Sequence, residues 1–190
     1  ILDEAVQELK ETEFRDLFLG DPTQRLQEAA GTGRPKECNI ETDLQILIPD
    51  QYVSSVSERL QLYSKLDRAK NPEELRKVLT GMIDRFGPLP AEVEQLADIV
   101  RLRWQACQVG FEKLTLKKNL LKGFIPAANN ERYFQSDTFG NILSYVQTHP
   151  RSASMKERKE QLILSIEDVK NVQAAKRILS ELGSEETVGV

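Results

Sequence analysis

The spacing of the hydrophobic residues changes at Gly110, and this change constrains the fold more than any other feature of the sequence. From Val56 to Gly110, apolar side chains recur every three or four residues, which places them on one face of each helix. After Gly110 they alternate with polar residues, which is the pattern of a strand with one buried face. Because the helical and strand patterns follow each other in blocks, the sequence predicts an α+β domain.

Three helices are predicted before Gly110, and their ends carry residues that favour helix termini. Asn71-Pro72 suits the N-cap and the first position of the second helix, with Glu74 placed to reach back to the cap. Gly87-Pro88 suits its end, because glycine accepts a left-handed backbone and proline forbids continuation. The third helix is expected over about 90–110. The predicted buried side chains are Val56, Leu60, Leu62, Tyr63 and Leu66 in the first helix, Leu75, Val78, Leu79, Met82 and Phe86 in the second, and Val93, Leu96, Ala97, Val100, Trp104 and Cys107 in the third.

Strands are predicted on both sides of this helical run. Residues 40–48 alternate between apolar and polar side chains and are expected to form one strand, which Pro49 ends because proline cannot donate to a ladder. Short antiparallel strands mixed with two helices are expected after Gly110. In order, these are strands near 114–116 and 120–125 around a Lys-Lys-Asn turn, a helix at 136–148, a hairpin from Met155 to Ile166 that turns near Arg158-Lys159, and a helix from about Asp168 to Leu182.

The α+β domain is expected to span residues 39–183. Residues 1–19 have a helical apolar pattern, and residues 20–38 contain glycine and proline with few large apolar groups, which is typical of a linker. The end, 184–190, is expected to fray. Because the chain begins at Ile1 rather than at a methionine, we expect it to be part of a longer protein.

The charge of the chain is acidic overall but unevenly distributed. The formal net charge is −4, and residues 1–48 alone carry 11 acidic and 5 basic side chains, a net of −6. Nucleic-acid binders usually present a basic field, so nucleic-acid binding by this chain is not the leading expectation. The densest basic stretch contains Lys113, Lys117, Lys118 and Lys122. Two interpretations stay open for it: lysines that guard solvated strand edges, or contacts to phosphates.

The residue inventory argues against catalysis. His149 is the single histidine, and Cys38 and Cys107 are the only cysteines, so one chain cannot supply the four ligands of a structural zinc site. No phosphate-cradling glycine loop is present, and neither a catalytic constellation nor a cofactor site is predicted. His149 is expected to cap the end of its helix. No apolar run is long enough to span a membrane, and two cysteines do not form a disulfide framework, so a reducing cytoplasm is expected.

A tight corner between the second and third helices is the most distinctive short sequence. Residues Asp84-Arg85-Phe86-Gly87-Pro88-Leu89-Pro90 combine an aromatic anchor, a glycine turn and two prolines, with Asp84 and Arg85 on the outer side. Together with its flanks, this motif resembles the C-terminal domain of the bacterial transcription-repair coupling factor. The resemblance covers residues 40–116 well and continues more loosely to 182. It rests on Ile48-Pro49-Asp50-Gln51-Tyr52-Val53, Glu58-Arg59-Leu60, Leu62-Tyr63, Glu74-Leu75, the stretch from Ile83 to Pro90, Arg101, Ala106 and Gly110-Phe111-Glu112-Lys113-Leu114.

The resemblance implies a regulatory role. In that family an ATP-driven DNA translocase motor lies upstream, and residues 1–10 look like the helix that joins this domain to it. The domain packs on the N-terminal module of the same protein and covers the surface that recruits the damage-recognition ATPase of the excision nuclease. It is released when the motor engages RNA polymerase. The resemblance therefore implies a non-catalytic, autoinhibitory protein-interaction domain that acts in DNA repair.

The interaction residues are carried over by position. The family pattern has acidic groups at the end of the second helix that face basic groups on the N-terminal module, and Asp84 matches that position. Arg85 is a second candidate at the same corner. Relatives can carry a glutamate one turn earlier, where this sequence has Gly81. The alternatives are that Asp84 is only a local cap or ion-pair partner, or that the domain binds nucleic acid through the Lys113–Lys122 stretch.

Overall fold

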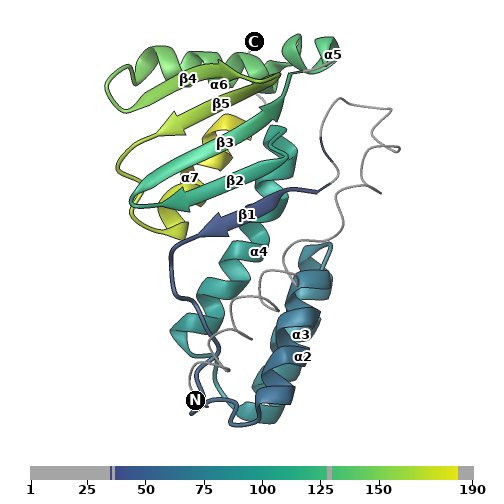
Figure 1. The fold of residues 1–190 in the computed structure, drawn as a ribbon. Helices are drawn as coiled ribbons and strands as arrows, with labels where there is room; N and C mark the ends of the chain where they lie inside the picture. Colours follow the sequence, from purple (N-terminus) through teal and green to yellow (C-terminus); the bar gives the residue numbers. More distant parts are fainter. Residues whose placement is uncertain (1–34, 36, 128–129, 184–190) are drawn as a thin grey trace, which may run out of the picture. The chain divides into compact units, whose positions relative to one another are not determined.

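The computed structural model describes residue 35, residues 37–127 and residues 130–183 (Figure 1). The expected helix at 1–19, most of the expected linker and the expected frayed end lie outside these ranges. The chain divides into two compact units, and the boundary falls within one helix, between Val100 and Arg101. Residues 46–100 are the described part of the first unit. Residues 35, 37–45, 101–127 and 130–183 are the described part of the second.

The first unit is built from helices whose ends follow the predicted capping signals. Helix α2 is Val56–Arg68, α3 is Pro72–Phe86, and α4, Ala91–Val109, begins in this unit. The Asn71 side chain accepts a hydrogen bond from the Glu74 amide at 2.9 Å. The Glu74 carboxylate in turn accepts from the Lys70 amide and the Asn71 side-chain amide, at 2.9 and 2.8 Å. The predicted reciprocal cap is confirmed, and it satisfies amides that a helix start otherwise leaves unpaired.

The buried face of α2 is narrower than predicted. Leu62, Tyr63 and Leu66 are buried, whereas Val56 is 62% exposed and Leu60 is 38% exposed. With 100° of rotation per residue, Val56 and Leu60 lie together on one flank of the helix, away from the centre of the face that Leu62 and Leu66 define. The prediction was wrong for this pair because helical spacing aligns side chains with each other but does not say which face meets the core.

The predicted buried face of α4 is correct only in its first half. Val93, Leu96, Ala97 and Val100 are buried, but Trp104 and Cys107 are only half-buried. Beyond the unit boundary the buried residues are Leu102, Ala106 and Val109 instead. The buried residues therefore change from one face of the helix to the other along its length, so a single continuous stripe does not describe it.

The second unit contains a five-stranded sheet with the order β1-β2-β3-β5-β4 (Figure 1). The strands are β1 Asn39–Thr42, β2 Lys113–Lys117, β3 Leu120–Pro126, β4 Ala153–Arg158 and β5 Gln161–Ile166. Strand β1 runs parallel to β2, and the other neighbours are antiparallel. The two expected hairpins, β2–β3 and β4–β5, are confirmed. Their two-residue turns, Lys118-Asn119 and Lys159-Glu160, have positive φ at both positions, the conformation that matches the twist of the strands.

Strand β1 ends at Thr42, six residues before the predicted end. The Leu44 amide donates to the Thr42 hydroxyl at 3.0 Å, and the Asp43 carboxylate accepts from the Lys118 amide at 2.8 Å. These side-chain bonds replace ladder bonds and turn the chain away from the sheet. Ile46 and Ile48 are buried and Leu47 is exposed. Residues 43–48 therefore alternate between buried and exposed positions as the sequence indicates, but they do not form a strand.

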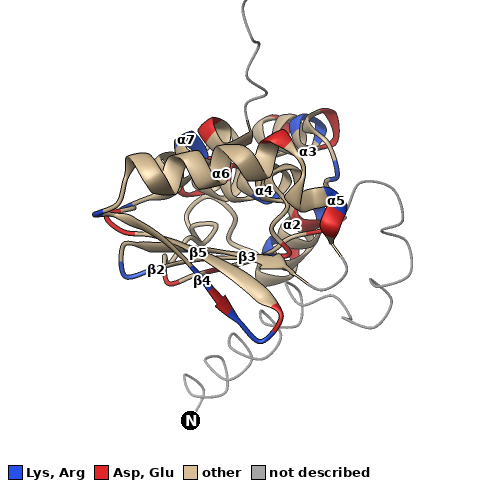
Figure 2. Cartoon of the chain, turned by 90° about the horizontal axis from the view of Figure 1, so that it is seen from above, with Lys and Arg blue, Asp and Glu red and all other residues tan. Residues whose placement is uncertain are grey.

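The helices of the second unit lie on one side of the sheet, as Figure 2 shows for α6 and α7. Helix α6 is Asp137–Thr148, α7 is Val172–Gly183, and the short α5, Glu131–Phe134, was not predicted. Helix α7 begins later than expected because Asp168 has φ +62°, which no right-handed helix accepts, and Asn171 caps the Ala174 amide at 2.8 Å. The core between these layers contains Leu114, Leu116, Leu121, Ile125, Leu164, Ile166, Ala175, Leu179 and Leu182.

Two glycines permit close approach of aromatic rings to the backbone. Gly110 has φ +100°, and a Cβ atom added there would overlap the ring of Tyr133. The Tyr133 hydroxyl donates to the Val109 carbonyl at 2.6 Å, which fixes the ring at this point. A Cβ atom on Gly123, in β3, would lie 2.5 Å from the Phe111 ring. The change of pattern at Gly110 therefore marks a turn where only glycine fits.

A candidate protein-interaction corner

The corner after α3 is the place where the sequence predicted an interaction surface. Helix α3 ends at Phe86, and Gly87 follows with φ +88° while its amide donates to the Ile83 carbonyl at 2.9 Å. The positive φ is as predicted, but ψ is −165°, outside the left-handed helical region. Asp84 and Arg85 are both exposed in the last turn of the helix. The corner thus presents an acid and a base side by side from one rigid turn.

The structure gives the two candidate residues different surroundings. Arg85 Nη2 lies 2.6 Å from Glu58 Oε1 of α2, and the guanidinium carbon lies 4.9 Å from the centroid of the Phe86 ring. Arg85 is therefore held by an ion pair and by a cation–π contact. Asp84 makes no ion pair or hydrogen bond with another residue in the described ranges. Its carboxylate is available to a cation from outside, whereas Arg85 would first have to leave Glu58.

Tyr52 supports the corner from the loop before α2. Its hydroxyl lies 2.9 Å from the Gly87 carbonyl oxygen and 3.2 Å from the Met82 carbonyl oxygen. Its ring meets the Phe86 ring edge to face, with centroids 5.8 Å apart. One side chain thus ties the end of α3 and the turn beyond it to the loop. No helical or strand periodicity points to Tyr52, and only its place in the family motif singled it out.

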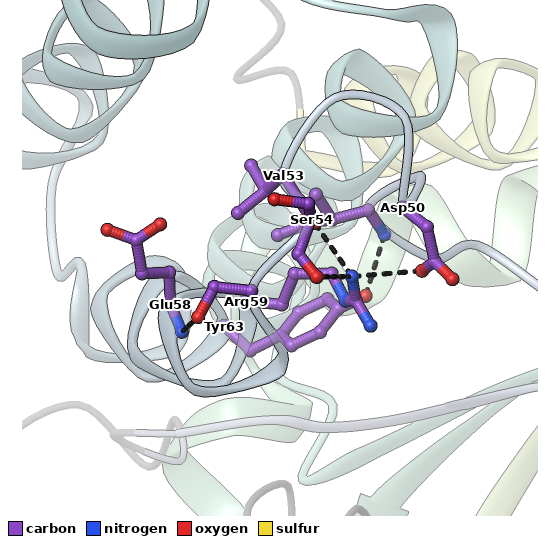
Figure 3. Close-up of polar contacts among 8 residues, drawn as sticks. Asp50, Val53, Ser54, Glu58, Arg59 and Tyr63 are labelled. Atoms are coloured by element: carbon purple, nitrogen blue, oxygen red, sulfur yellow. Dashed lines mark hydrogen bonds and ion pairs between the residues drawn. The ribbon is translucent and has the colours of Figure 1, made fainter.

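The loop that carries Tyr52 is clamped by Arg59 of α2. One Arg59 guanidinium nitrogen lies 2.7 Å from the Val53 carbonyl, 3.2 Å from the Ser54 carbonyl and 3.0 Å from Asp50 Oδ1 (Figure 3). The Asp50 side chain is 84% exposed, while that of Arg59 is only 15% exposed. Because this nitrogen carries two N–H groups, the three acceptors share its donors. Arg59 therefore holds this loop against α2.

Tyr63 completes the clamp at the start of the loop. Its hydroxyl oxygen accepts a hydrogen bond from the Ile48 amide at 2.6 Å. Burial raises the pKa of Tyr63, so the phenol stays neutral. The motif residues around positions 48–53, 58–63 and 83–87 are thus joined in space by Tyr52, Arg59 and Tyr63. This arrangement can hold a charged surface rigidly, and it contains no nucleophile with an adjacent base.

The four candidate lysines have different surroundings. Glu41 of β1 accepts ion pairs from Lys113 at 2.6 Å and Lys117 at 2.9 Å, and these bonds lower the pKa of Glu41. Lys118 lies in the β2–β3 turn, where its amide binds Asp43. Lys122 lies on β3, the middle strand of the sheet. Because β2 and β3 are interior strands, the explanation that these lysines guard sheet edges does not apply to Lys113, Lys117 or Lys122.

The remaining titratable candidates have structural surroundings. His149 is the C-cap of α6, and its Nδ1 lies 3.1 Å from the Tyr145 carbonyl oxygen, as expected for a capping histidine. Burial raises the pKa of Cys38 above its ordinary range and that of Cys107 to about 11, so both thiols stay protonated at neutral pH. Within residues 37–127 and 130–183, no three potential metal ligands of the His, Cys, Asp or Glu type come together. No described helix is long and apolar enough to cross a bilayer.

These features define a class: an α+β domain with a rigid polar corner. A family described as "TRCF domain" matches residues 42–136, half of the chain, so the chain belongs to the TRCF domain family. The transcription-repair-coupling factor of Escherichia coli is 38% identical over 79 residues, which are 42% of this chain and 7% of that protein. That of Rickettsia bellii is 33% identical over 117 residues, 62% of this chain and 10% of the relative.

Longer coverage comes from a third relative and from a solved structure. The transcription-repair-coupling factor of Staphylococcus epidermidis is 30% identical over 142 residues, 70% of this chain and 12% of the relative. The crystal structure of the C-terminal domain of a transcription-repair coupling factor superimposes with a TM-score of 0.56 at 23% identity, covering 78% of this chain and 96% of that one. This likeness shows a shared fold. The chain spans about a tenth of the length of these curated relatives.

Proposed function

We propose that this chain is a non-catalytic, autoinhibitory interaction domain of a bacterial transcription-repair coupling factor. In this proposal it binds the N-terminal module of the same protein and masks the surface that recruits the damage-recognition ATPase of the excision nuclease. Engagement of RNA polymerase by the motor releases the mask. Membership of the TRCF domain family supports the protein context, and the exposed carboxylate of Asp84 on a braced corner supports the contact.

The corner has the chemistry of a contact that must open again. A masking surface made of apolar side chains would bind permanently, whereas polar contacts respond to salt and to competing partners. Asp84 presents one carboxylate from a turn held by Tyr52, so the charge is positioned before the partner arrives. Preorganisation lowers the entropic cost of binding. A masking energy of about 1–3 kcal/mol is the usual size of a coupling between two sites and changes affinity about 5- to 150-fold.

Arg85 has the supporting role in this proposal. Its ion pair with Glu58 and its stacking on Phe86 brace the last turn of α3 beside Asp84. Arg85→Gln should therefore lower stability slightly, by about 0.2–1 kcal/mol for an exposed ion pair. Its effect on partner binding should be smaller than that of Asp84→Lys, because Arg85 does not offer the acidic group.

The test measures binding between the chain and the separately produced N-terminal module by calorimetry. Asp84→Lys should weaken binding by about 5- to 150-fold. The substitution places a cation in the last turn of a helix, where the helix dipole stabilises positive charge, so the variant should still fold. Glu157→Lys, the same charge change on an exposed residue of β4 in the other unit, is the matched control and should leave affinity unchanged.

Two outcomes would contradict the proposal. Binding that survives Asp84→Lys at full strength removes Asp84 from the contact. Absence of any binding between the two wild-type pieces at low salt removes the masking function itself. A nucleic-acid site made of the four candidate lysines alone is a weaker alternative, because Glu41 engages Lys113 and Lys117, and Lys118 lies in a turn.

A further inference from the structure

The outer face of the five-stranded sheet, opposite α6 and α7, carries an unusual arrangement of side chains. Residues that pair across strands point to the same side, so the register defines rows on this face. One row is Lys113–Phe124–Ile163–Lys156, across β2, β3, β5 and β4. The next row is Thr115–Lys122–Ser165–Ser154, on the same four strands. The first row thus has Phe124 and Ile163 at its centre and a lysine at each end. The second row carries three hydroxyl side chains and the Lys122 amine.

The cations of this face extend beyond those noticed in the sequence. Lys156 and Arg158 lie on β4, far along the chain from Lys122, and the alternation of the strand brings them to the same side. The outer-face residues of the strands thus include five cations, Lys113, Lys117, Lys122, Lys156 and Arg158. Glu41 is the single acid among the outer-face strand residues described, which gives these strand residues a net charge of +4. Just before β2, the Glu112 carboxylate accepts a hydrogen bond from the side chain of Gln161, a residue of the same face. The acidic net charge of the whole chain therefore hides a basic face.

Three of the five cations are uncommitted. Lys122, Lys156 and Arg158 form no ion pair with another residue in the described ranges, whereas Glu41 holds Lys113 and Lys117. Lys122 stands on the central strand, where no edge needs protection. Phe124 also stands on that strand, half-exposed, with the Lys113 ammonium 5.8 Å from its ring centroid. Phe124 lies on the face of the sheet away from the core, so packing in the core does not account for an aromatic residue at this position.

We propose that this outer sheet face binds single-stranded nucleic acid. A base stacks on Phe124 against Ile163, and the adjoining phosphates are bound by Lys122 and the hydroxyls of its row. Lys156 and Arg158 contact the phosphates that follow along β4. Stacking platforms with flanking cations suit single strands because every base has a flat face and every nucleotide one negative charge. A duplex keeps its bases stacked internally and offers Phe124 no ring to stack on.

Glu41 sets the strength of this site. Because it engages two of the five cations, the wild-type face offers three phosphate contacts and binds weakly at physiological salt. This explains how the site can coexist with an acidic chain. Removal of the Glu41 charge frees Lys113 and Lys117 and should tighten nucleic-acid binding. A purely structural role for these ion pairs would not predict tighter binding.

The test uses the full chain and a fluorescently labelled oligothymidylate in an anisotropy titration, beginning at about 0.01 M salt, where charge interactions are least screened. Three phosphate contacts predict a slope of log affinity against log salt of about −2.1, since each contributes about 0.7 for a single strand. Lys122→Gln should reduce the slope to about −1.4. Glu41→Gln should steepen it to about −3.5 with higher affinity.

Phe124→Leu separates stacking from charge. It keeps an apolar side chain and every cation, and should lower affinity about 5- to 150-fold with the slope unchanged. Lys65→Gln, on α2 in the other unit, is the charge-matched control and should change neither quantity. Asp84→Lys should also have no effect, so this test stands apart from that of the masking contact. Urea midpoints from Trp104 fluorescence check that each variant folds.

Three results would overturn the proposal. The first is no binding of the wild-type chain at the lowest salt. The second is binding that Lys122→Gln and Glu41→Gln leave unchanged. The third is equal competition by polyglutamate together with no effect of Phe124→Leu, which would make this face a docking site for an acidic polypeptide instead.

Discussion

Substitution of Gly110 by alanine tests the turn that separates the helical and strand halves of the sequence. The new methyl group would destabilise the fold in two ways, through the backbone conformation and through a steric overlap. The backbone φ of +100° disfavours any residue with a Cβ atom, at a cost of about 1–2 kcal/mol. The Cβ atom would also lie 2.7 Å from Tyr133 Cζ and 2.8 Å from its hydroxyl oxygen, and such overpacking costs about 1–3 kcal/mol. We expect Gly110→Ala to lower the free energy of unfolding by about 2–5 kcal/mol.

Urea unfolding followed by the fluorescence of Trp104 measures this loss. Trp104 is the single tryptophan and lies in the part of α4 that belongs to the second unit, as Gly110 does. Gly140→Ala in α6 is the matched control. Nothing lies within 4 Å of the added Cβ atom, so this exchange should raise stability by about 0.5–1 kcal/mol. The two substitutions add the same methyl group and are expected to have opposite signs.

A double-mutant cycle with Tyr133→Leu divides the cost of Gly110→Ala into its two parts. Leucine lacks the distal ring atoms that the new methyl group meets, so only the backbone cost of about 1–2 kcal/mol should remain in that background. A loss below about 1 kcal/mol in the wild-type background would refute the backbone argument. An equal loss in both backgrounds would refute the steric argument, because no contact with Tyr133 would then contribute.

Three further predictions concern the corner and the sheet. Gly81→Ala should stabilise α3 by about 0.5–1 kcal/mol and so raise the thermal unfolding midpoint, because nothing lies within 4 Å of the new Cβ atom. A lowered midpoint would contradict the conclusion that this position has room for a methyl group. Tyr52→Phe keeps the ring but loses the hydrogen bond to the Gly87 carbonyl, and should cost about 0.5–1.5 kcal/mol in urea unfolding while weakening module binding; unchanged stability would mean that water replaces the bond. Glu41, whose pKa is lowered in the folded state from 4.5, contributes stability that is present above that value and lost as pH falls through its folded pKa. The stability difference between wild type and Glu41→Gln should therefore shrink below about pH 4.5, and a constant difference would argue against the ion pairs.

The predicted and observed elements agree where the signal is local. The Asn71 cap, the positive φ of the glycine after Phe86 and the approximate positions of both hairpin turns depend on a few neighbouring residues, and the structure contains each of them. The second turn is Lys159-Glu160, one residue beyond the expected Arg158-Lys159. Local hydrogen bonds and backbone preferences act on the same residues in the chain and in the fold, which is why the order of residues is enough to predict them. Helix α5, only four residues long, has too short a pattern to show any period.

The candidate site was predictable only in part. The corner motif located Asp84 and Arg85, but their different surroundings depend on Glu58 and Phe86. The brace of the corner by Tyr52 joins residues about 30 positions apart, a separation over which no periodicity carries information. Similarly, the burial of Leu62 and the exposure of Leu60 depend on which flank of α2 meets its neighbours.

The α+β class, the positions of most helices and strands, and the motif of the corner follow from the order of residues alone, because they depend on interactions within a few positions. The sheet order, the parallel pairing of β1 with β2, and the placement of Lys156 and Lys122 on the same sheet face arise from contacts between distant segments. Such contacts form where burial of apolar area is greatest, a property of the whole packed structure. The basic face of an acidic chain is therefore a product of strand register, which no count of charges along the sequence contains.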